Sequence, residues 1–234
     1  MESDNLPGYA AVSHALTPVG FKAVVKDPEV VALVKEADRQ LALLGYTEHG
    51  QRHARLVAKN ARSVLLALGE DERVAELAAI AGYLHDVGNV INREQHERMS
   101  ALLARDILLR LGMGYSEVLR IVAAIGNHHE EGGNPVSEVS AALILADKAD
   151  VHRSRVRNPA LIKFDIHDRV NYAVQRSTLT VDREGKTITF RLKVDTTIAP
   201  VMEYFEIFLS RMTISRRAAD FLGLQFELRI NGTR

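Results

Sequence analysis

Seven side chains that can bind a metal ion follow one another between positions 53 and 147 of this chain of 234 residues. In chain order they are His53, His85, Asp86, His96, His128, His129 and Asp147. Each lies near the end of an expected helix or on its apolar face, where an unpartnered imidazole or carboxylate costs several kcal/mol. A divalent cation can stabilise several such groups at once. Because the chain has no cysteine, imidazole and carboxylate must supply the ligands of any metal centre.

Two of these residues differ in how well they fit a purely structural role. A single histidine on the buried side of a helix, such as His53, is more often a hydrogen-bonded core residue than a ligand. Asp147 is harder to explain in that way, because Val139, Leu143 and Asp147 follow one another along one apolar stripe. An ion pair with Lys148 is not expected, since adjacent side chains on a helix point about a hundred degrees apart. The ordered set therefore favours metal ligation for all seven.

The local sequences around these residues give a second signal. They are LHDVGN at 84–89, a histidine that opens the next expected helix, HHE at 128–130 and LADKAD at 145–150. Between about Thr47 and Asn158 this ordered set resembles the HD-domain superfamily of metal-dependent phosphohydrolases, named for its adjacent His-Asp pair. The resemblance implies a mainly α fold, an HD-domain helical bundle.

The resemblance also implies an enzyme, a phosphatase or phosphodiesterase with two divalent metal ions. It would hydrolyse a phosphomonoester or phosphodiester of a small, nucleotide-like substrate with a hydroxide that bridges the two metals. Iron or manganese fits the mixed imidazole and carboxylate ligands best, with magnesium, nickel, cobalt and zinc as alternatives.

Each motif residue takes a role by this resemblance. The first metal would be held by His53, His85, Asp86 and Asp147. The second would be held by Asp86, His96, His128 and His129. Asp86 is the natural bridge, because a carboxylate can bind two metals whereas an imidazole occupies a single position. The catalytic residues implied are Asp86, His85 and Lys148.

Two departures separate the chain from one branch of the superfamily. The histidines and the HHE element are similar to the HD-GYP cyclic di-GMP phosphodiesterases, but EEGGNPVS stands where the GYP tripeptide would be, and Asn89 stands where lysine is typical. Cyclic di-GMP is therefore not the expected substrate. Two other functions are kept open: a di-iron oxygenase on the same scaffold, and a non-catalytic nucleotide-binding sensor.

Other ionisable residues fit less specific interpretations. His49 could reach a third cation or a substrate phosphate, but a solvent-exposed helix start is favoured. Lys148 and the basic run of Arg153, Arg155 and Arg157 could hold a substrate phosphate, although a short basic run is usually a solvated face. The remaining candidates, expected to lie at the surface, are His14, His152 and His167.

The hydrophobic pattern predicts how the chain is organised. Residues 1–27 are expected to be an irregular arm and 28–160 the metal-binding helical domain. The expected helices are 28–45, 47–68, 71–85, 94–111, 116–128 and 137–152. After Pro159, residues 161–234 are expected to form a small α+β (ββαβ) unit. It has a hairpin around Glu184 and Gly185, a helix over 199–222 broken near Thr213, and a last strand, LQFELRI.

Composition excludes some functional classes. Thirty basic residues balance thirty acidic ones, which gives no support for broad nucleic-acid binding. No apolar run is long enough to span a bilayer, and the acidic first residues do not resemble a signal peptide, so a cytoplasmic location is expected. The open edges of the small sheet could pair two copies into a homodimer.

Overall fold

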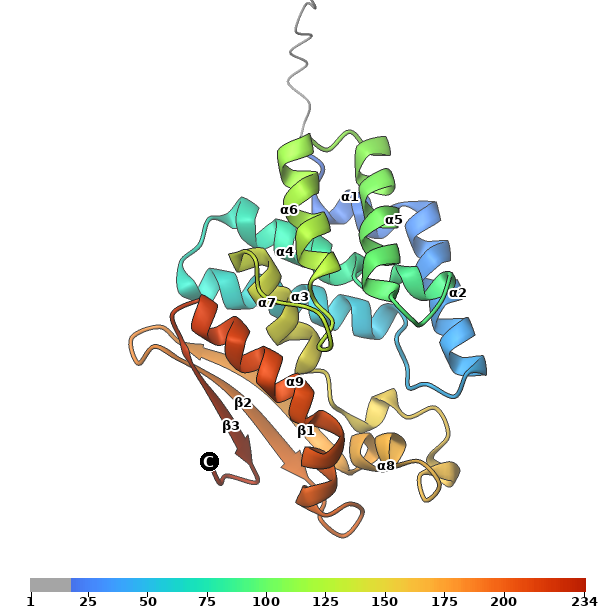
Figure 1. Cartoon of the computed structure of the whole chain (residues 1–234), viewed down its shortest axis with the longest axis vertical. Helices are drawn as coiled ribbons and strands as arrows, with labels where there is room; N and C mark the ends of the chain where they lie inside the picture. Colours follow the sequence, from blue (N-terminus) through green and yellow to red (C-terminus); the bar gives the residue numbers. More distant parts are fainter. Residues whose placement is uncertain (1–17) are drawn as a thin grey trace, which may run out of the picture.

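The computed structural model describes residues 18–234, and His14 lies outside the described residues. Its first part contains α1 (Phe21–Lys26), α2 (Pro28–Leu43), α3 (Gln51–Leu68), α4 (Glu72–Leu84), the 3-10 turn η1 (Val87–Val90), α5 (His96–Arg110), α6 (Tyr115–Gly126) and α7 (Glu138–Lys148). The 3-10 turns η2 (Arg153–Arg155) and η3 (Pro159–Leu161) then lead to α8 (Ile166–Ala173), β1 (Val174–Asp182), β2 (Thr187–Val194), α9 (Val201–Phe221) and β3 (Gln225–Ile230). A helical body with a small sheet at one end confirms the predicted class (Figure 1).

The segment expected to be irregular contains a short helix, so that prediction is wrong for α1. The backbone N–H of Phe21 donates to Glu76 Oε1 at 2.8 Å, and its ring meets Tyr83 edge to face with centroids 5.9 Å apart. Val24 is fully buried. These contacts come from α4, more than fifty positions away, so the local proline and glycine signals could not reveal them.

Helix α7 is the centre of the helical body. Every residue from Val139 to Lys148 is buried, and the helix packs against α3, α4, α6 and α9. A helix buried on all sides offers no solvent to an ionisable side chain. Asp147 and Lys148 on its last turn must therefore have partners inside the protein.

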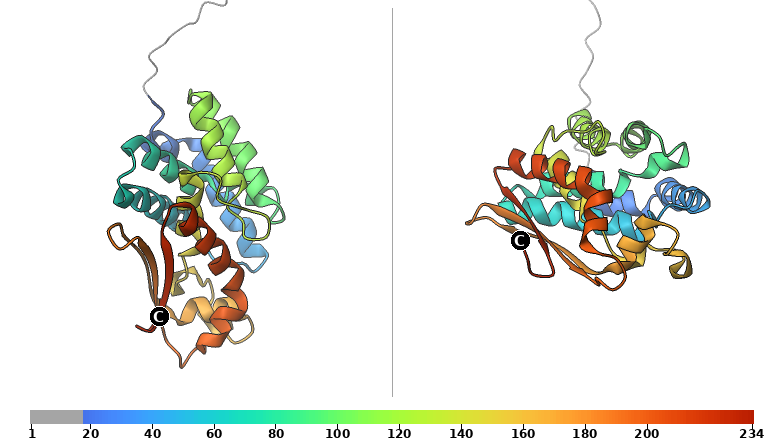
Figure 2. Two further views of the ribbon diagram at one scale, coloured as in Figure 1. Left: turned by 60° about the vertical axis from the view of Figure 1, so that its left-hand side comes forward. Right: turned by 60° about the horizontal axis from the view of Figure 1, so that its bottom comes forward.

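The sheet has the predicted ββαβ topology, with strand order β1-β2-β3. Strands β1 and β2 form an antiparallel hairpin in which Leu179 faces Phe190. Strand β3 runs parallel to β2 and places Leu228 beside Phe190. Helix α9 makes the crossover between β2 and β3 and covers one face of the sheet, as Figure 2 shows.

Two details of this unit differ from expectation. Helix α9 is continuous through Thr213, whose hydroxyl donates to the Leu209 carbonyl at 3.0 Å, so the side chain is satisfied without a break. Helix α8 was not predicted. It is eight residues long and is capped by Asp165, which accepts from the N–H groups of His167 and Asp168. Such a short helix gives little periodicity to detect.

The C-terminal unit packs on the helical body. The larger hydrophobic cluster combines the helical core with Ile188, Ile214, Ala218, Ala219 and Leu224. A smaller cluster lies between the sheet, α8 and α9 and includes Phe190, Tyr204 and Phe208. The division of the chain at residue 160 stays a prediction, because the larger core crosses it. Among the described helices, none combines the length and apolar character needed to cross a membrane.

Candidate metal centre

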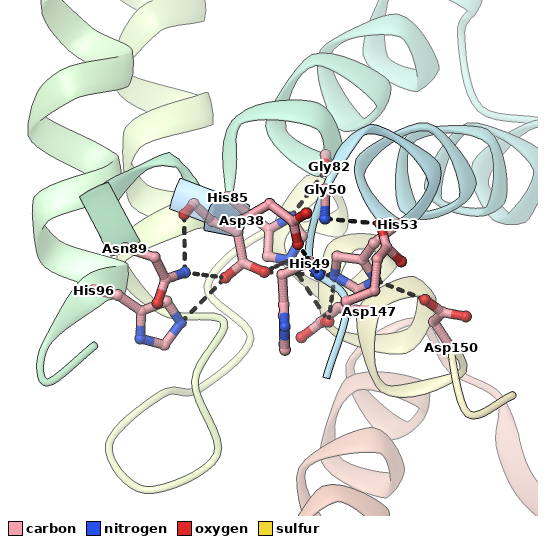
Figure 3. Close-up of polar contacts among 12 residues, drawn as sticks. Asp38, His49, Gly50, His53, Gly82, His85, Asn89, His96, Asp147 and Asp150 are labelled. Atoms are coloured by element: carbon pink, nitrogen blue, oxygen red, sulfur yellow. Dashed lines mark hydrogen bonds and ion pairs between the residues drawn. The ribbon is translucent and has the colours of Figure 1, made fainter. Parts of the chain in front are cut away.

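Four side chains from three helices converge inside the bundle (Figure 3). His53 comes from α3, His85 and Asp86 from the end of α4, and Asp147 from α7. His53 Nε2 lies 3.2 Å from His85 Nε2 and 3.5 Å from both Asp86 Oδ2 and Asp147 Oδ1. His85 Nε2 lies 3.3 and 3.6 Å from the same two oxygens. These four residues are called the inner group below.

The spacing of these atoms fits a shared cation. Ligands at about 2.1 Å from one metal, separated by right or tetrahedral angles, lie about 3.0–3.4 Å from each other. If all four atoms carried lone pairs they would repel one another, so either a cation or a proton on His85 must lie between them. The donor set is chemically suited to a divalent ion: ligand atoms of His53, His85 and Asp86 lie within 4.8 Å of one another, and Asp147 forms such a set with His85 and His128.

A close approach of two helices sets the position of His85. The Nδ1–H of His85 donates to the Gly82 carbonyl at 2.9 Å. A Cβ atom at Gly82 would lie 2.9 Å from the Ala58 Cα and N atoms, so only glycine lets the last turn of α4 rest on the backbone of α3. This contact places His85 beside His53 of α3.

A second set of side chains lies next to the first. His96 is the first residue of α5, and His128 follows the end of α6. Both share a possible metal position with Asp86, because ligand atoms of the three lie within 4.8 Å of one another. The rings of His96 and His128 pack edge to face with centroids 5.3 Å apart. Asp86, His96 and His128 are called the outer group below.

Asp86 faces both groups with different oxygens. Its Oδ2 is directed at His53 and His85, whereas its Oδ1 lies 3.4 Å from His96 Nε2. Asn89 fixes this orientation, since its side-chain amide donates to Asp86 Oδ1 at 3.1 Å and to the Asp86 carbonyl at 2.9 Å. The carboxylate is held in the orientation that a bridging ligand needs.

Each imidazole has one nitrogen committed to the protein. The Nδ1 partner of His53 is the Asp150 carboxylate, at 2.7 Å. The Nδ1 atoms of His96 and His128 face the carbonyls of Arg93 and Ile125. A carbonyl can only accept, so in these rings Nδ1 carries the proton and Nε2 keeps its lone pair. This is the arrangement typical of metal-binding histidines.

The charges of the two groups differ. Burial lowers the pKa of His85, but the carboxylates of Asp86 and Asp147 outweigh burial and raise that pKa to about 10. Burial raises the pKa of Asp86, yet the nearby His85 charge keeps it well below its usual value. Burial also lowers the pKa of His96 to about 4, so this ring is neutral at pH 7. The inner group attracts positive charge, whereas the outer group offers neutral imidazoles.

Lys148 makes the ion pair that the sequence analysis did not expect. Its Nζ lies 2.7 Å from Asp147 Oδ2 and 2.7 Å from Glu130 Oε2. The expectation was wrong because the long lysine chain folds back, although its Cβ points away from that of Asp147. Asp147 thus directs one oxygen at the inner group and the other at a buried ammonium.

Asp150, the last residue of LADKAD, was not predicted as part of the site. It is 1% exposed, and besides His53 it binds Arg52 Nη2 at 2.8 Å. Burial raises its pKa, but Arg155 and His53 hold that pKa far below the usual range. A second acid three positions after Asp147 was the signal available in the sequence. Such an acid behind a histidine orients the ring and strengthens it as a ligand.

His49 and Arg155 are buried, so the surface interpretations of both are wrong. His49 is 9% exposed and Arg155 only 2%. Arg155 Nη2 donates to His49 Nε2 at 2.8 Å, while His49 Nδ1 faces the Thr47 carbonyl. Both ring nitrogens of His49 are therefore used within the protein. Arg155 also donates to the Asp150 carbonyl at 2.8 Å, which places it behind the site as a structural cation.

The other candidates are less closely placed. The His129 ring packs edge to face on His96 with centroids 5.1 Å apart, but among the described residues it is in none of the close groups of ligand atoms. Its ligation stays a prediction. Arg157 pairs with Asp38 rather than facing the site. Exposed positions were expected for two further histidines: His167 is exposed, while His152 is half-buried and contacts the Gln175 carbonyl.

Comparison with known proteins agrees with this geometry. The family model described as "HD domain" matches residues 50–153, the segment that contains both groups. The match covers somewhat less than half of the chain. The chain after residue 153, with η3, α8, α9 and the sheet, lies beyond the matched segment on its C-terminal side.

Individual proteins are similar to this chain to different extents. An uncharacterized protein of Methanocaldococcus jannaschii is 27% identical over 197 residues, covering 74% of both chains. A ribonuclease Y of a Sulfurovum species is 32% identical over 56% of this chain, and one of Lawsonia intracellularis is 28% identical over 51%. The chain spans only 24% and 21% of the length of these two. The crystal structure of a predicted HD superfamily hydrolase from an uncultured Thermotogales bacterium matches 53% of this chain and 67% of its own, with 25% identity and a TM-score of 0.43.

Proposed function

We propose that the protein is a metal-dependent phosphohydrolase that cleaves a phosphomonoester or phosphodiester of a nucleotide-like substrate. The observation that carries the proposal is the position of Asp86, whose two oxygens face two adjacent sets of imidazoles. Protein ligands of this kind can hold two divalent ions about 3.5–4 Å apart. The match of residues 50–153 to the HD domain supports the same reaction class, because the motif residues resemble those of the metal-dependent phosphohydrolases of that superfamily.

In this proposal the inner group holds one ion and the outer group, assisted by His129, the other. Bound there, the two ions would supply Lewis acidity for a phosphoryl oxygen and lower the pKa of water enough to give a nucleophile at neutral pH. Asp150 holds the His53 ring in orientation, and Asn89 does the same for the Asp86 carboxylate. Lys148 balances the charge of Asp147 from its buried position, so we assign it a positioning role.

The phosphodiester side of this proposal has separate support. Two relatives are named ribonuclease Y, and a ribonuclease acts on phosphodiester bonds. Both are much longer than this chain, so their substrate is not transferred as a whole. A phosphodiester and a phosphomonoester therefore both belong in the first assay.

The proposal is tested by hydrolysis of 4-nitrophenyl phosphate and bis(4-nitrophenyl) phosphate by protein loaded with iron or manganese under anaerobic conditions. We expect turnover that disappears on chelation and returns on reloading with metal. Equal rates for chelated and metal-loaded protein would contradict the proposal. Oxygen consumption by the iron-loaded protein, without hydrolysis of either ester, would favour the di-iron oxygenase instead.

A further inference from the structure

A cavity lies beside the candidate metal centre, between the helical body and the C-terminal unit. Its volume is about 440 Å³, within the range of small-molecule sites. The helical body contributes Tyr46, His49 and Arg93 to its wall, and α9 contributes Phe208 and Arg211. The cavity therefore exists only because α9 packs against the helical body.

Two of the wall residues connect the cavity to the metal-binding groups. The His49 ring meets that of His53 with centroids 5.4 Å apart. Arg93 Nη1 donates to Asn89 Oδ1 at 3.2 Å, and Asn89 in turn holds Asp86. A substrate with its reacting phosphate at the metal-binding groups would extend its remaining part into this space.

Most charged groups of the wall already have partners. Arg155 donates hydrogen bonds to His49 Nε2 and to the Asp150 carbonyl. Glu130 pairs with Lys148 at 2.7 Å. On the α8 side, Asp165 accepts from two backbone N–H groups as the helix cap, and Asp168 is the other acid of the wall.

Arg93 is a cation with spare donors. Within the part of the chain that the structure describes, no carboxylate lies within 4 Å of its guanidinium, and its one side-chain hydrogen bond goes to Asn89. The guanidinium lies over the Tyr46 ring, 5.5 Å from its centroid. An aromatic support of this kind holds the plane of the guanidinium while leaving N–H groups at its edge available.

Arg211 is placed in a similar way from α9. Its Nε lies 3.4 Å from Glu130 Oε1, and its guanidinium lies over the Phe208 ring at 4.7 Å. Among residues 18–234, neither Nη atom of Arg211 donates a hydrogen bond to a side chain or carbonyl. Two supported guanidiniums, one from each part of the chain, thus line one cavity next to the metal-binding groups.

We propose that Arg93 and Arg211 bind a second anionic group of the substrate, a phosphate or carboxylate separate from the one that reacts. The inference rests on the proposed phosphohydrolase function for the position of the reacting phosphate. A planar guanidinium fork suits such an anion, and charge-assisted hydrogen bonds are the strong ones. The C-terminal unit would then determine specificity without contributing a metal ligand.

Inorganic pyrophosphate is the probe, because it presents two linked anionic groups. Calorimetric titration of protein freed of metal and of chelator should show binding that weakens at least tenfold in Arg93→Gln and in Arg211→Gln. The control variants are Arg98→Gln on α5 and Arg216→Gln on α9, both at exposed positions. Each control should bind within twofold of the unmodified protein.

A second measurement excludes an indirect effect through Glu130 and Lys148. In Arg211→Gln, the metal content and the KM for 4-nitrophenyl phosphate, which has a single anionic group, should stay within threefold of the unmodified protein. Arg211→Lys keeps the charge but not the fork and should weaken pyrophosphate binding by a smaller factor. Loss of metal or of aryl phosphate turnover in parallel with pyrophosphate binding would overturn the assignment.

Failure of this inference can be told apart from failure of the proposed function. If the unmodified protein hydrolyses aryl phosphate but binds pyrophosphate equally well without either arginine, or not at all, the second anion site is wrong. If pyrophosphate binding depends on both arginines and no ester is hydrolysed with any metal, the anion site stands and the proposed reaction fails.

Discussion

The inner and outer groups share Asp86 but are built from different parts of the fold. The inner group takes His53 from the first turn of α3 and Asp147 from the last turn of α7, and its atoms lie 3.2–3.6 Å apart. The outer group takes His96 from a helix start and His128 from the residues after a helix. Both groups therefore gather side chains from helix ends, and the difference between them lies in what surrounds the ligands.

The two groups differ in what stands behind the ligands. The inner group contains two carboxylates, and His53 is backed by Asp150, itself paired with Arg52. The outer group has only the shared carboxylate, and its imidazoles are backed by main-chain carbonyls. More negative charge and a carboxylate behind the imidazole favour tighter binding of a cation. We therefore expect the inner position to fill first and the outer position to be weaker.

Removal of the shared ligand should have the largest effect. In Asp86→Ala both positions lose a ligand, so metal content should fall from two ions per chain to none, and turnover should fall by orders of magnitude. Asp86→Asn keeps the size but not the charge and should behave alike. Full metal stoichiometry in the alanine variant, measured by mass spectrometry of the elements, would show that Asp86 does not join the groups.

Single substitutions in the two groups should separate them. His96→Ala should keep one ion per chain, because the inner group stays complete. His53→Ala should lose the tighter binding step, since this position has the carboxylate-backed imidazole. Metal titrations of both variants should show these different steps. Identical titrations, with both ions lost together, would mean that the two positions form one cooperative site.

The stability of metal-free protein should depend on pH in opposite directions for the two groups. His96 has a pKa lowered to about 4, so its stabilising effect is present above the unfolded value near 6.5 and is lost as pH falls toward 4. His85 has a pKa raised to about 10, so its contribution is present below 6.5 and is lost as pH rises toward 10. Urea unfolding should therefore show maximum stability near pH 6.5.

Burial lowers the pKa of His49 and His128 as well as that of His96, so the acid side has several contributors and the share of His96 is measured by its substitution. A difference of 2.5 pKa units corresponds to about 3 kcal/mol. In His96→Ala the decline in unfolding free energy between pH 6.5 and 4 should be smaller by up to this amount, while the decline above pH 7 should remain. If the substitution changed the unfolding free energy only on the alkaline side, the acid-side loss would not come from His96.

The smallest effect is expected from the residue behind the inner group. Asp150→Asn keeps a hydrogen-bond acceptor for His53 but removes the charge, so metal affinity should weaken about 10–100-fold. Competition with a chelator of known affinity measures this change, and Asp106→Asn on the exposed face of α5 is the matched control. An affinity unchanged in Asp150→Asn would remove the main difference between the two groups.

Local sequence was enough for the helices and for the ligand residues. The helices are indicated by apolar residues at helical spacing, by Pro28 at a helix start and by Gly69 after a helix end. Each of these signals lies within a few neighbouring positions of the chain. The adjacent His-Asp pair and the segments around it were equally local. The ligand set of the two groups, apart from the open case of His129, follows from these patterns together with the family resemblance.

Tertiary structure decided how these residues are partnered. His53 and Asp150 are 97 positions apart but lie at 2.7 Å, and Arg155 reaches His49 across 106 positions. The cavity wall joins Arg93 to Arg211 on the far end of the chain. Sequence periodicity indicates which face of a helix is buried, but not which distant side chain meets it there. Those contacts depend on how whole helices pack, a property of the complete core rather than of any segment.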